Sequence, residues 1–278
     1  MVIFDAYSCS VSELRDRISE ISNENQECLE DRNWVRGIPG FIDLTSLNNT
    51  DNRQDIATLC RKALKTHSKD HSGVPAVCIY STFLGTAREV LKGSGVKLAA
   101  VAGCFPTGQS PLSLKLAEIK YALENGADEI DMVINRGSFL SGDHEGLKKE
   151  VSLAKEACGP RHLKVILETG ELGSPGNIRK ASELALMAGA DFLKTSTGKS
   201  TPAATPEAAL VMIDTIKEFH LKTGKKAGFK PAGGISTPEH ALQYYGLVRS
   251  VLGVSWLTPD HFRIGASRLL DAVLSQFE

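Results

Sequence analysis

The sequence predicts an α/β protein built on a single (β/α)8 TIM barrel, with an extra helical segment at the N-terminus. Short apolar runs rich in β-branched residues alternate eight times with longer segments of helical period. The eight units take up about 240 residues, which is the usual size of a closed barrel. An open doubly wound sheet would more often carry a glycine-rich turn after its first strand, and none follows the first run here.

The predicted strands are "FIDLT" (41–45), "AVCIY" (76–80), "LAAVAG" (98–103), "EIDMVI" (129–134), "LKVILET" (163–169), "DFLKTST" (191–197), "AGFKPAG" (227–233) and "FRIGAS" (262–267). Amphipathic stretches separate them. Two of these stretches begin with Thr-Pro-Glu, at Thr205 and Thr237. A hydroxyl N-cap, a proline in the first turn and a carboxylate near the positive end of the helix dipole favour a helix start. The alternation therefore predicts a parallel sheet covered by helices.

Residues 1–36 lie outside this repeat, and residues 37–278 form the predicted barrel. Ser10 and Glu13 have the spacing of a capping box. One helical face follows them, made of Val11, Leu14, Ile18 and Ile21. We interpret the segment as a helix packed on the barrel or on a partner subunit. A disordered tail is the alternative, and the sequence leaves both open.

The composition is that of an ordinary soluble protein, with 42% hydrophobic and 23% charged residues and a net charge of −1. This balance gives no reason to expect nucleic acid or an anionic membrane as a partner. No apolar run approaches the roughly 20 residues that span a bilayer, and the start of the chain does not resemble a targeting signal. The six cysteines show no zinc-site or disulfide pattern. We expect reduced thiols and a cytoplasmic protein.

An internal repeat aligns two charged residues. "NGADEIDMV" (125–133) and "AGADFLKTS" (188–196) share a Gly-Ala-Asp junction between helix and strand, and superposing them puts Asp131 in register with Lys194. Alternate strands of a barrel contribute inward side chains to the same layer. We therefore expect both charges inside the barrel, where isolated charges cost several kcal/mol.

The seventh predicted strand adds Lys230, close to its carboxyl end. If Lys230 lies beside Lys194, desolvation and like charge would both depress a lysine pKa. A neutral lysine is a nucleophile that forms a Schiff base with a carbonyl. The alternative is that both lysines make interior ion pairs, for instance with Asp131 or Glu168. The position at the carboxyl ends of the strands, where barrel active sites lie, favours catalysis.

The last two strand ends have the features of a phosphate site. Gly233 and Gly234 follow the seventh strand, and Ser267 closes the eighth. The loops at these two places often bind phosphate in such barrels through backbone N–H groups and a helix N-terminus. Lys199 would add a cation from the neighbouring loop. Ordinary turn glycines are the alternative.

Taken together, "DFLKTSTGK", "GFKPAGGI", "ADEIDMVIN", "LKVILETGEL", "FIDLT" and "FRIGAS" resemble deoxyribose-phosphate aldolase. The resemblance runs from about Phe41 to the end of the chain, by strand order. It implies a class I aldolase that uses no metal or cofactor and reversibly cleaves a small phosphorylated sugar, 2-deoxy-D-ribose 5-phosphate. It assigns the Schiff base to Lys194 and proton transfer to Asp131. It also implies that Lys230 perturbs the Lys194 amine. It places substrate contacts at Asp43, Cys78, Thr197, Lys199, Gly233, Gly234, Gly265 and Ser267.

The chain departs from this family at three places. Arg268 stands where relatives often have a small hydroxyl residue, the C-terminal "LSQFE" lacks the tyrosine of some relatives, and the N-terminal segment is longer than in compact bacterial members. Three alternatives stay open: another Schiff-base barrel aldolase, a transaldolase, or a catalytically silent barrel that serves as a scaffold. A homodimer or a higher homo-oligomer is possible by analogy.

Overall fold

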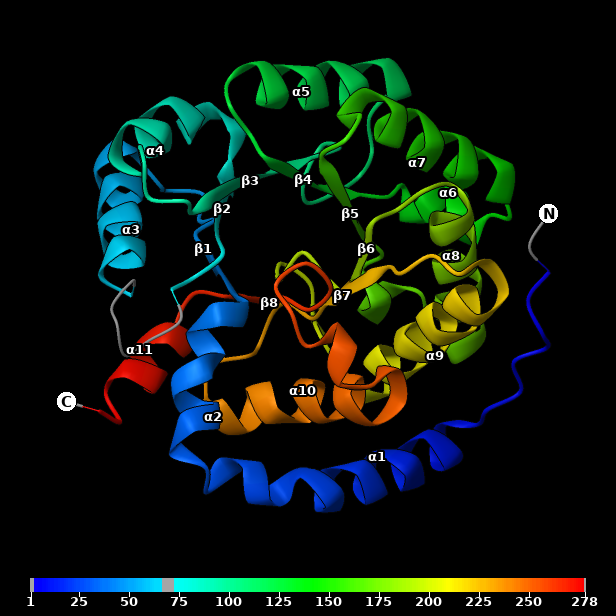
Figure 1. Ribbon diagram of the computed structural model, residues 1–278. Helices are drawn as coiled ribbons and strands as arrows, with labels where there is room; N and C mark the ends of the chain where they lie inside the picture. Colours follow the sequence, from blue (N-terminus) through cyan, green and yellow to red (C-terminus); the bar gives the residue numbers. More distant parts are fainter. Residues whose placement is uncertain (1–2, 67–72, 278) are drawn as a thin grey trace.

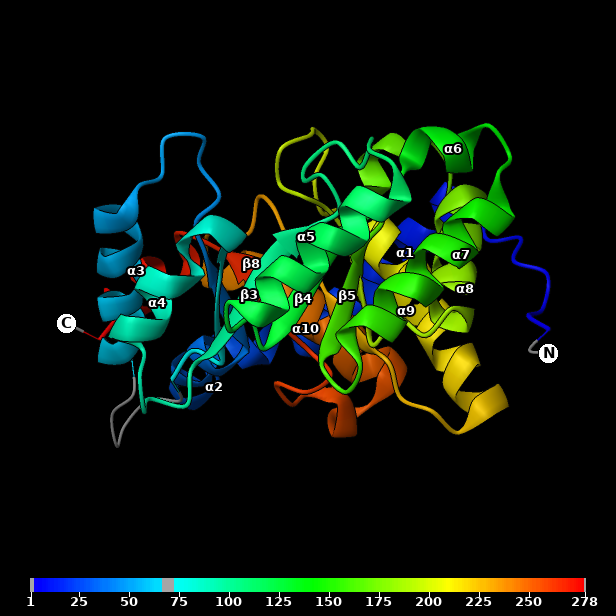
Figure 2. The same cartoon turned by 90° about the horizontal axis from the view of Figure 1, so that it is seen from above.

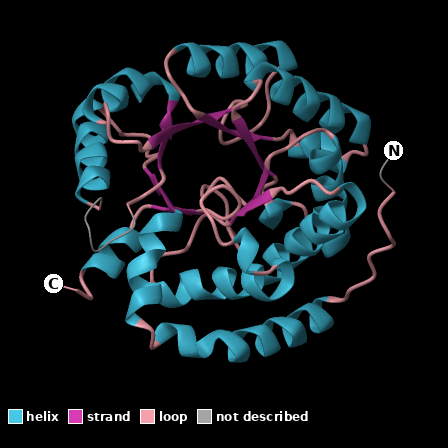
Figure 3. Ribbon diagram, viewed as in Figure 1, coloured by secondary structure: helices cyan, strands magenta, loops and turns pink. Residues whose placement is uncertain are grey.

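In the computed structural model, which describes residues 3–66 and 73–277, eight parallel strands curl into a barrel (Figures 1 and 3). The strands are β1 (Ile42–Thr45), β2 (Ala76–Tyr80), β3 (Lys97–Ala102), β4 (Glu129–Val133), β5 (His162–Ile166), β6 (Phe192–Lys194), β7 (Gly228–Lys230) and β8 (Ile264–Ala266). They pair in the order β7-β6-β5-β4-β3-β2-β1-β8. Bridges between Phe229 and Phe262 and between Ala232 and Gly265 bring the two edges together. The predicted (β/α)8 barrel is confirmed.

Helices surround the sheet on all sides (Figure 1). They are α1 (Val11–Asn25), α2 (Arg32–Gly37), α3 (Arg53–Lys65), α4 (Leu84–Val90), α5 (Leu112–Glu124), α6 (Arg136–Leu140), α7 (His144–Cys158), α8 (Pro175–Met187), α9 (Pro206–Thr223), α10 (Pro238–Leu252) and α11 (Leu269–Leu274). The two predicted helix starts are confirmed. The Thr205 hydroxyl accepts a hydrogen bond from the Ala208 N–H, and the Thr237 hydroxyl accepts one from the His240 N–H.

The last three strands are shorter than the sequence predicts, since β6 ends at Lys194, β7 at Lys230 and β8 at Ala266. Beyond β6, hydroxyl side chains add hydrogen bonds to the remaining backbone ones. The Thr195 hydroxyl accepts from the Ala232 N–H at 3.0 Å, and the Ser196 hydroxyl donates to the Ala232 carbonyl at 3.0 Å. The chain is thereby released into loops at the carboxyl end of the barrel, at the top of Figure 2.

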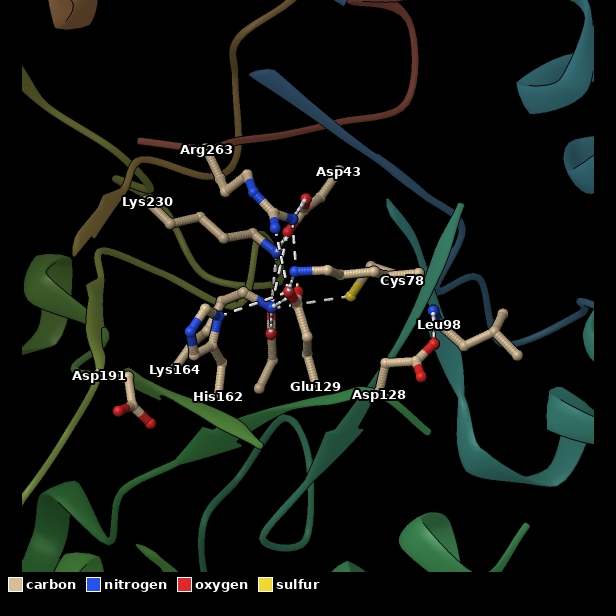
Figure 4. A network of polar contacts seen from close by, with 12 residues as sticks. Asp43, Cys78, Leu98, Asp128, Glu129, His162, Lys164, Asp191, Lys230 and Arg263 are labelled. Atoms are coloured by element: carbon tan, nitrogen blue, oxygen red, sulfur yellow. Dashed lines mark hydrogen bonds and ion pairs between the residues drawn. The ribbon is translucent and has the colours of Figure 1, made fainter. Parts of the chain in front are cut away.

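The Gly-Ala-Asp repeat has a structural cause. Asp128 accepts from the backbone N–H of Leu98 at 2.8 Å (Figure 4), and Asp191 accepts from that of Leu163 at 2.7 Å. Each aspartate thus ties the start of its strand to the preceding strand. Asp131 and Lys194 each lie three residues further along, so the two anchors bring both charges to matching heights in the barrel.

The N-terminal segment contains the predicted helix. Both hydrogen bonds of the Ser10–Glu13 capping box are present, and α1 packs outside the barrel against α10 and α9 (Figure 1). Leu14 is fully buried in the core, and Arg17 binds both carboxylate oxygens of Asp214 at 2.7 and 2.9 Å. A disordered tail is therefore wrong for residues 11–25.

Two further expectations concern cysteines and membranes. All six cysteines are free thiols, as the sequence predicts. Within residues 3–66 and 73–277, no helix combines the length and apolarity needed to span a membrane.

Leu14→Ala should lower the free energy of unfolding by about 2–4 kcal/mol, because it opens a cavity where α1 joins the core. Urea unfolding followed by circular dichroism measures this. Val11→Ala is the matched control, since Val11 is 42% exposed and its truncation should change the free energy by less than about 0.5 kcal/mol. Equal effects of the two substitutions would mean that α1 does not share the core.

Candidate active site

Two lysines end neighbouring strands of the barrel. Lys194 closes β6 and Lys230 closes β7, and the two residues are directly paired in the strand register. The exposed fraction is 2% for Lys194 and 0% for Lys230. Both ammonium groups are therefore removed from water, where an unpaired charge would be costly.

Asp131, on β4, is the shared partner of these lysines. Its Oδ2 atom lies 2.7 Å from Lys194 Nζ and 2.7 Å from Lys230 Nζ. Its Oδ1 atom accepts from Lys164 Nζ at 2.8 Å, and the Cys78 thiol donates to Oδ2 at 3.7 Å. The structure thus brings together the three residues that the sequence predicts as catalytic.

The ion-pair alternative is partly confirmed, because Asp131 does bind both lysines. Glu168 does not bind either of them. Its backbone has left-handed angles (φ 55°, ψ 60°), and its carboxylate accepts from the N–H and the hydroxyl of Thr197. Burial raises the pKa of Glu168.

The sequence analysis missed three charged residues of the same interior: Glu129, Lys164 and Arg263. Lys164 Nζ also binds Glu129 at 2.6 Å, and Arg263 binds both Glu129 and Asp43 (Figure 4). The alternation of side chains along a strand could have revealed them, because residues two apart point to the same side of the sheet. Glu129 stands two residues before Asp131, and Lys164 interrupts an apolar strand as Lys194 does.

The charged groups of this interior stabilise one another's ionised forms. Burial alone would raise the pKa of Asp131, but the ammonium groups of Lys164, Lys194 and Lys230 outweigh it and hold that pKa well below its usual range. Burial alone would lower the pKa of Lys230, but the carboxylates of Asp131 and Asp43 outweigh it and raise that pKa. The raised pKa of Lys230 was not predicted from the sequence, because its second carboxylate, Asp43, lies far away along the chain.

A cavity of about 250 Å³ opens at the carboxyl end of the barrel above Lys194. It is lined by the ends of β1, β6 and β8 and by the loops that follow β1, β6, β7 and β8. Six predicted site residues reach it besides Lys194: Thr197, Lys199, Gly233, Gly234, Gly265 and Ser267. Arg268, which the prediction left out, also lines it. Asp43 and Cys78 do not; both are fully buried beneath it.

The wall near β7 and β8 offers unused hydrogen-bond donors. Among the described residues, the backbone N–H groups of Gly233, Gly234 and Ser267 have no acceptor. Gly233 (φ 88°) and Gly234 (φ 84°) adopt left-handed conformations, and a Cβ on Gly233 would lie 2.6 Å from that of Ala203. Glycine is therefore required where this wall meets the cavity.

No metal-binding group was found among the described residues. Within residues 3–66 and 73–277, no three His, Cys, Asp or Glu side chains are placed to hold an ion.

Comparison with known proteins agrees with the barrel fold. Residues 40–245 match the model of the DeoC/LacD family of aldolases. The chain belongs to that family. It is an aldolase, a carbon–carbon lyase.

Similar proteins cover most of the chain. Deoxyribose-phosphate aldolase of Mus musculus is 48% identical over 255 residues, which are 87% of this chain and 80% of that protein. The Homo sapiens enzyme of the same name is 46% identical with the same coverage. A deoxyribose phosphate aldolase from Aeropyrum pernix, described as tetrameric, superposes with a TM-score of 0.72 at 26% identity, over 94% of this chain and 98% of that one.

The buried charges predict how stability depends on pH. The pKa values of Asp43, Glu129 and Asp131 are lowered in the folded state. Their contribution to the free energy of unfolding is therefore complete above the unfolded pKa of about 4 and is lost as the pH falls below it. Urea unfolding at a series of pH values from 7 to 3 should show this loss.

The matched variant is Asp43→Asn, which removes one of the three carboxylates. The difference in the free energy of unfolding between wild type and variant should shrink as the pH falls, by up to about 1.4 kcal/mol per pH unit. A difference that stays constant from pH 5 to pH 3 would contradict this account.

Proposed function

We propose that the protein reversibly cleaves 2-deoxy-D-ribose 5-phosphate to D-glyceraldehyde 3-phosphate and acetaldehyde through a Schiff base on Lys194, in the breakdown of deoxyribonucleosides. One observation carries this proposal. Of the three buried lysines that bind Asp131, Lys194 is the one that lines the cavity. The names of the similar mouse and human enzymes support the choice of substrate.

Lys194 supplies the electron sink for the cleavage. Its neutral amine attacks the aldehyde carbon C1 of the open-chain sugar, and loss of water gives a protonated imine. A base removes the proton of the C3 hydroxyl. The C2–C3 bond then breaks, its electron pair enters the iminium as an enamine, and the three-carbon aldehyde phosphate leaves. Protonation of the enamine at C2 and hydrolysis release acetaldehyde and restore Lys194.

Asp131 transfers the protons of these steps, with Lys230 bound beside it. Asp131 Oδ2 already accepts a hydrogen bond from Lys194 Nζ at 2.7 Å. This distance is short enough for Asp131 to take a proton from the Lys194 amine or to return one. Lys230 donates to the same oxygen and stays cationic, since its pKa is raised. It therefore holds Asp131 in place. We assign the transfers at C2 and C3 to Asp131 acting through a water molecule.

The phosphate of the substrate binds at the wall of the cavity near β7 and β8. The free N–H groups of Gly233, Gly234 and Ser267 would donate to its oxygens. Lys199 and Arg268 line the same cavity, and neither makes an ion pair within the described part of the chain. These two cations would provide the charge that a dianion needs, and Arg268 would do so in place of a small hydroxyl residue.

The chain also forms a homo-oligomer in this proposal. Support comes from the related enzyme described as tetrameric and from exposed apolar side chains, among them Leu114, Tyr121 and Leu140.

Borohydride trapping tests the proposed nucleophile. Incubation with deoxyribose 5-phosphate and reduction should add mass to the peptide that carries Lys194. Lys194→Ala should abolish this adduct and lower kcat/KM at least about a thousandfold. Lys120→Ala, on an exposed part of α5, is the control and should do neither. If the folded wild-type protein gives an adduct only with another sugar phosphate, the Schiff-base mechanism holds for that sugar and the proposed substrate is wrong.

The phosphate wall is tested by kinetics with two substrates. Lys199→Met and Arg268→Ser should each raise KM for deoxyribose 5-phosphate about tenfold or more, because a charged hydrogen bond is lost. Neither should change kcat/KM for unphosphorylated deoxyribose more than about twofold. Equal losses on both sugars would show that these side chains do not recognise the phosphate.

A further inference from the structure

The buried charges beneath the cavity form a closed ring in which positive and negative residues alternate. Figure 4 labels Lys164, Glu129, Arg263, Asp43 and Lys230 of this ring. In order around the ring, the members are Asp131, Lys164, Glu129, Arg263, Asp43 and Lys230. Each member is at most 1% exposed. They come from β1, β4, β5, β7 and the residue before β8, with Glu129 and Asp131 both on β4. The ring therefore exists only once the barrel is assembled.

One half of the ring runs through Lys164 and Arg263. Asp131 Oδ1 accepts from Lys164 Nζ at 2.8 Å, and Lys164 Nζ donates to Glu129 Oε2 at 2.6 Å. The guanidinium of Arg263 then holds both oxygens of Glu129, at 3.0 and 3.3 Å.

The other half returns through Asp43. Arg263 Nη1 donates to Asp43 Oδ1 at 2.6 Å, and Asp43 Oδ2 accepts from Lys230 Nζ. Lys230 Nζ closes the ring on Asp131 Oδ2 at 2.7 Å. Three carboxylates and three cations therefore satisfy one another, and the ring as a whole carries no net charge.

Lys194 stands outside this ring as a seventh charged group. Its ion pair among the described residues is with Asp131 Oδ2, at 2.7 Å, an oxygen that also serves Lys230. We propose that the neutral ring makes Lys194 the surplus cation of the barrel interior. Arg263 and Lys164 thereby promote loss of its proton and Glu129 limits that effect, although none of the three touches the substrate. They are positioning residues that act through Asp131. The inference rests on the proposed role of Lys194 as nucleophile.

The protonation of the ring members supports this division. Burial opposes the charge of every member, yet the pKa of each carboxylate is lowered and that of each ring cation is raised by its ring partners. The ring partners therefore favour the charged form of every ring member, and Lys194 is the charged group that the ring does not compensate.

Other charged groups reach the ring from the opposite end of the barrel. Lys97 Nζ lies 3.4 Å from Glu129 Oε1 and 3.8 Å from Asp260, so its charge has its own partner. His162 Nδ1 lies 3.6 Å from the same oxygen of Glu129. The side chains of Lys97 and His162 are 40% and 30% exposed, so water screens them more than the ring.

On the cavity side, the titratable and charged groups are the Cys78 thiol, the Glu168 carboxyl and two exposed cations. Burial raises the pKa of the Cys78 thiol and of the Glu168 carboxyl. Lys199 and Arg268 lie at the exposed rim of the cavity. The four groups are the same in every variant below, so differences among the variants report on the ring.

The test measures the proton on Lys194 without relying on turnover. The protein is treated with formaldehyde and cyanoborohydride at a series of pH values, and methylation of the Lys194 peptide is followed by mass spectrometry. Only the neutral amine reacts. Glu129→Gln gives the ring a positive charge and should shift the midpoint of the profile down by about one pH unit, whereas Arg263→Met should shift it up by about as much. Lys164→Met should act like Arg263→Met.

The double variant Glu129→Gln/Arg263→Met gives the sharpest test, because it restores neutrality without restoring any contact. Its midpoint should return to within about 0.3 pH unit of wild type, as should that of Arg263→Lys. Lys115→Met is the matched control, since it removes a buried cation paired with Glu150 far from the ring. It should lower stability and leave the midpoint unchanged.

The proposal is overturned if folded single variants shift the midpoint in the same direction or not at all, or if the double variant stays shifted. If Glu129→Gln does not fold, two other variants still test the proposal. Lys164→Met should shift the midpoint up, and Arg263→Lys should leave it unchanged. Opposite shifts in a protein that does not cleave deoxyribose 5-phosphate would support the ring and count against the proposed substrate alone.

Discussion

The interior of the barrel depends on one carboxylate, Asp131, which three ammonium groups share. Each of those lysines would be costly to bury alone, and the carboxylate would be equally costly without them. Their mutual compensation lets the barrel place an amine at the floor of a cavity with little water around it. The strand anchors Asp128 and Asp191 serve the same end, because they set the heights at which Asp131 and Lys194 meet.

The architecture separates compensation from reaction along the barrel axis. Beneath the cavity, the charges of the alternating ring compensate one another. Toward the carboxyl ends, the strands stop at Lys194 and Lys230, and loops rich in glycine and hydroxyl groups form a cavity with unused donors. A rigid charged floor and a polar anion-binding wall are what an amine nucleophile and a phosphorylated aldehyde would need.

The catalytic candidates could be predicted from the sequence because charged residues interrupt the apolar runs of the strands. Lys194 and Lys230 are visible as single charges in apolar strands, and the Gly-Ala-Asp repeat aligns Asp131 with Lys194. Glu129, Lys164 and Arg263 break the pattern as well, yet a single sequence does not say which charges meet across a barrel. The raised pKa of Lys230 was missed for that reason, since its second carboxylate, Asp43, lies 187 positions away along the chain.

The sequence by itself determined the barrel, the order of its strands, the cap of α1 and the starts of α9 and α10, because each rests on local periodicity or on a few neighbouring residues. Tertiary structure alone decided where the strands end, which side chains face the cavity and how the charges pair. Those outcomes depend on contacts between residues far apart in the chain. The closure of the ring is the clearest case: it needs the barrel to close first, since β1 and β7 supply neighbouring members.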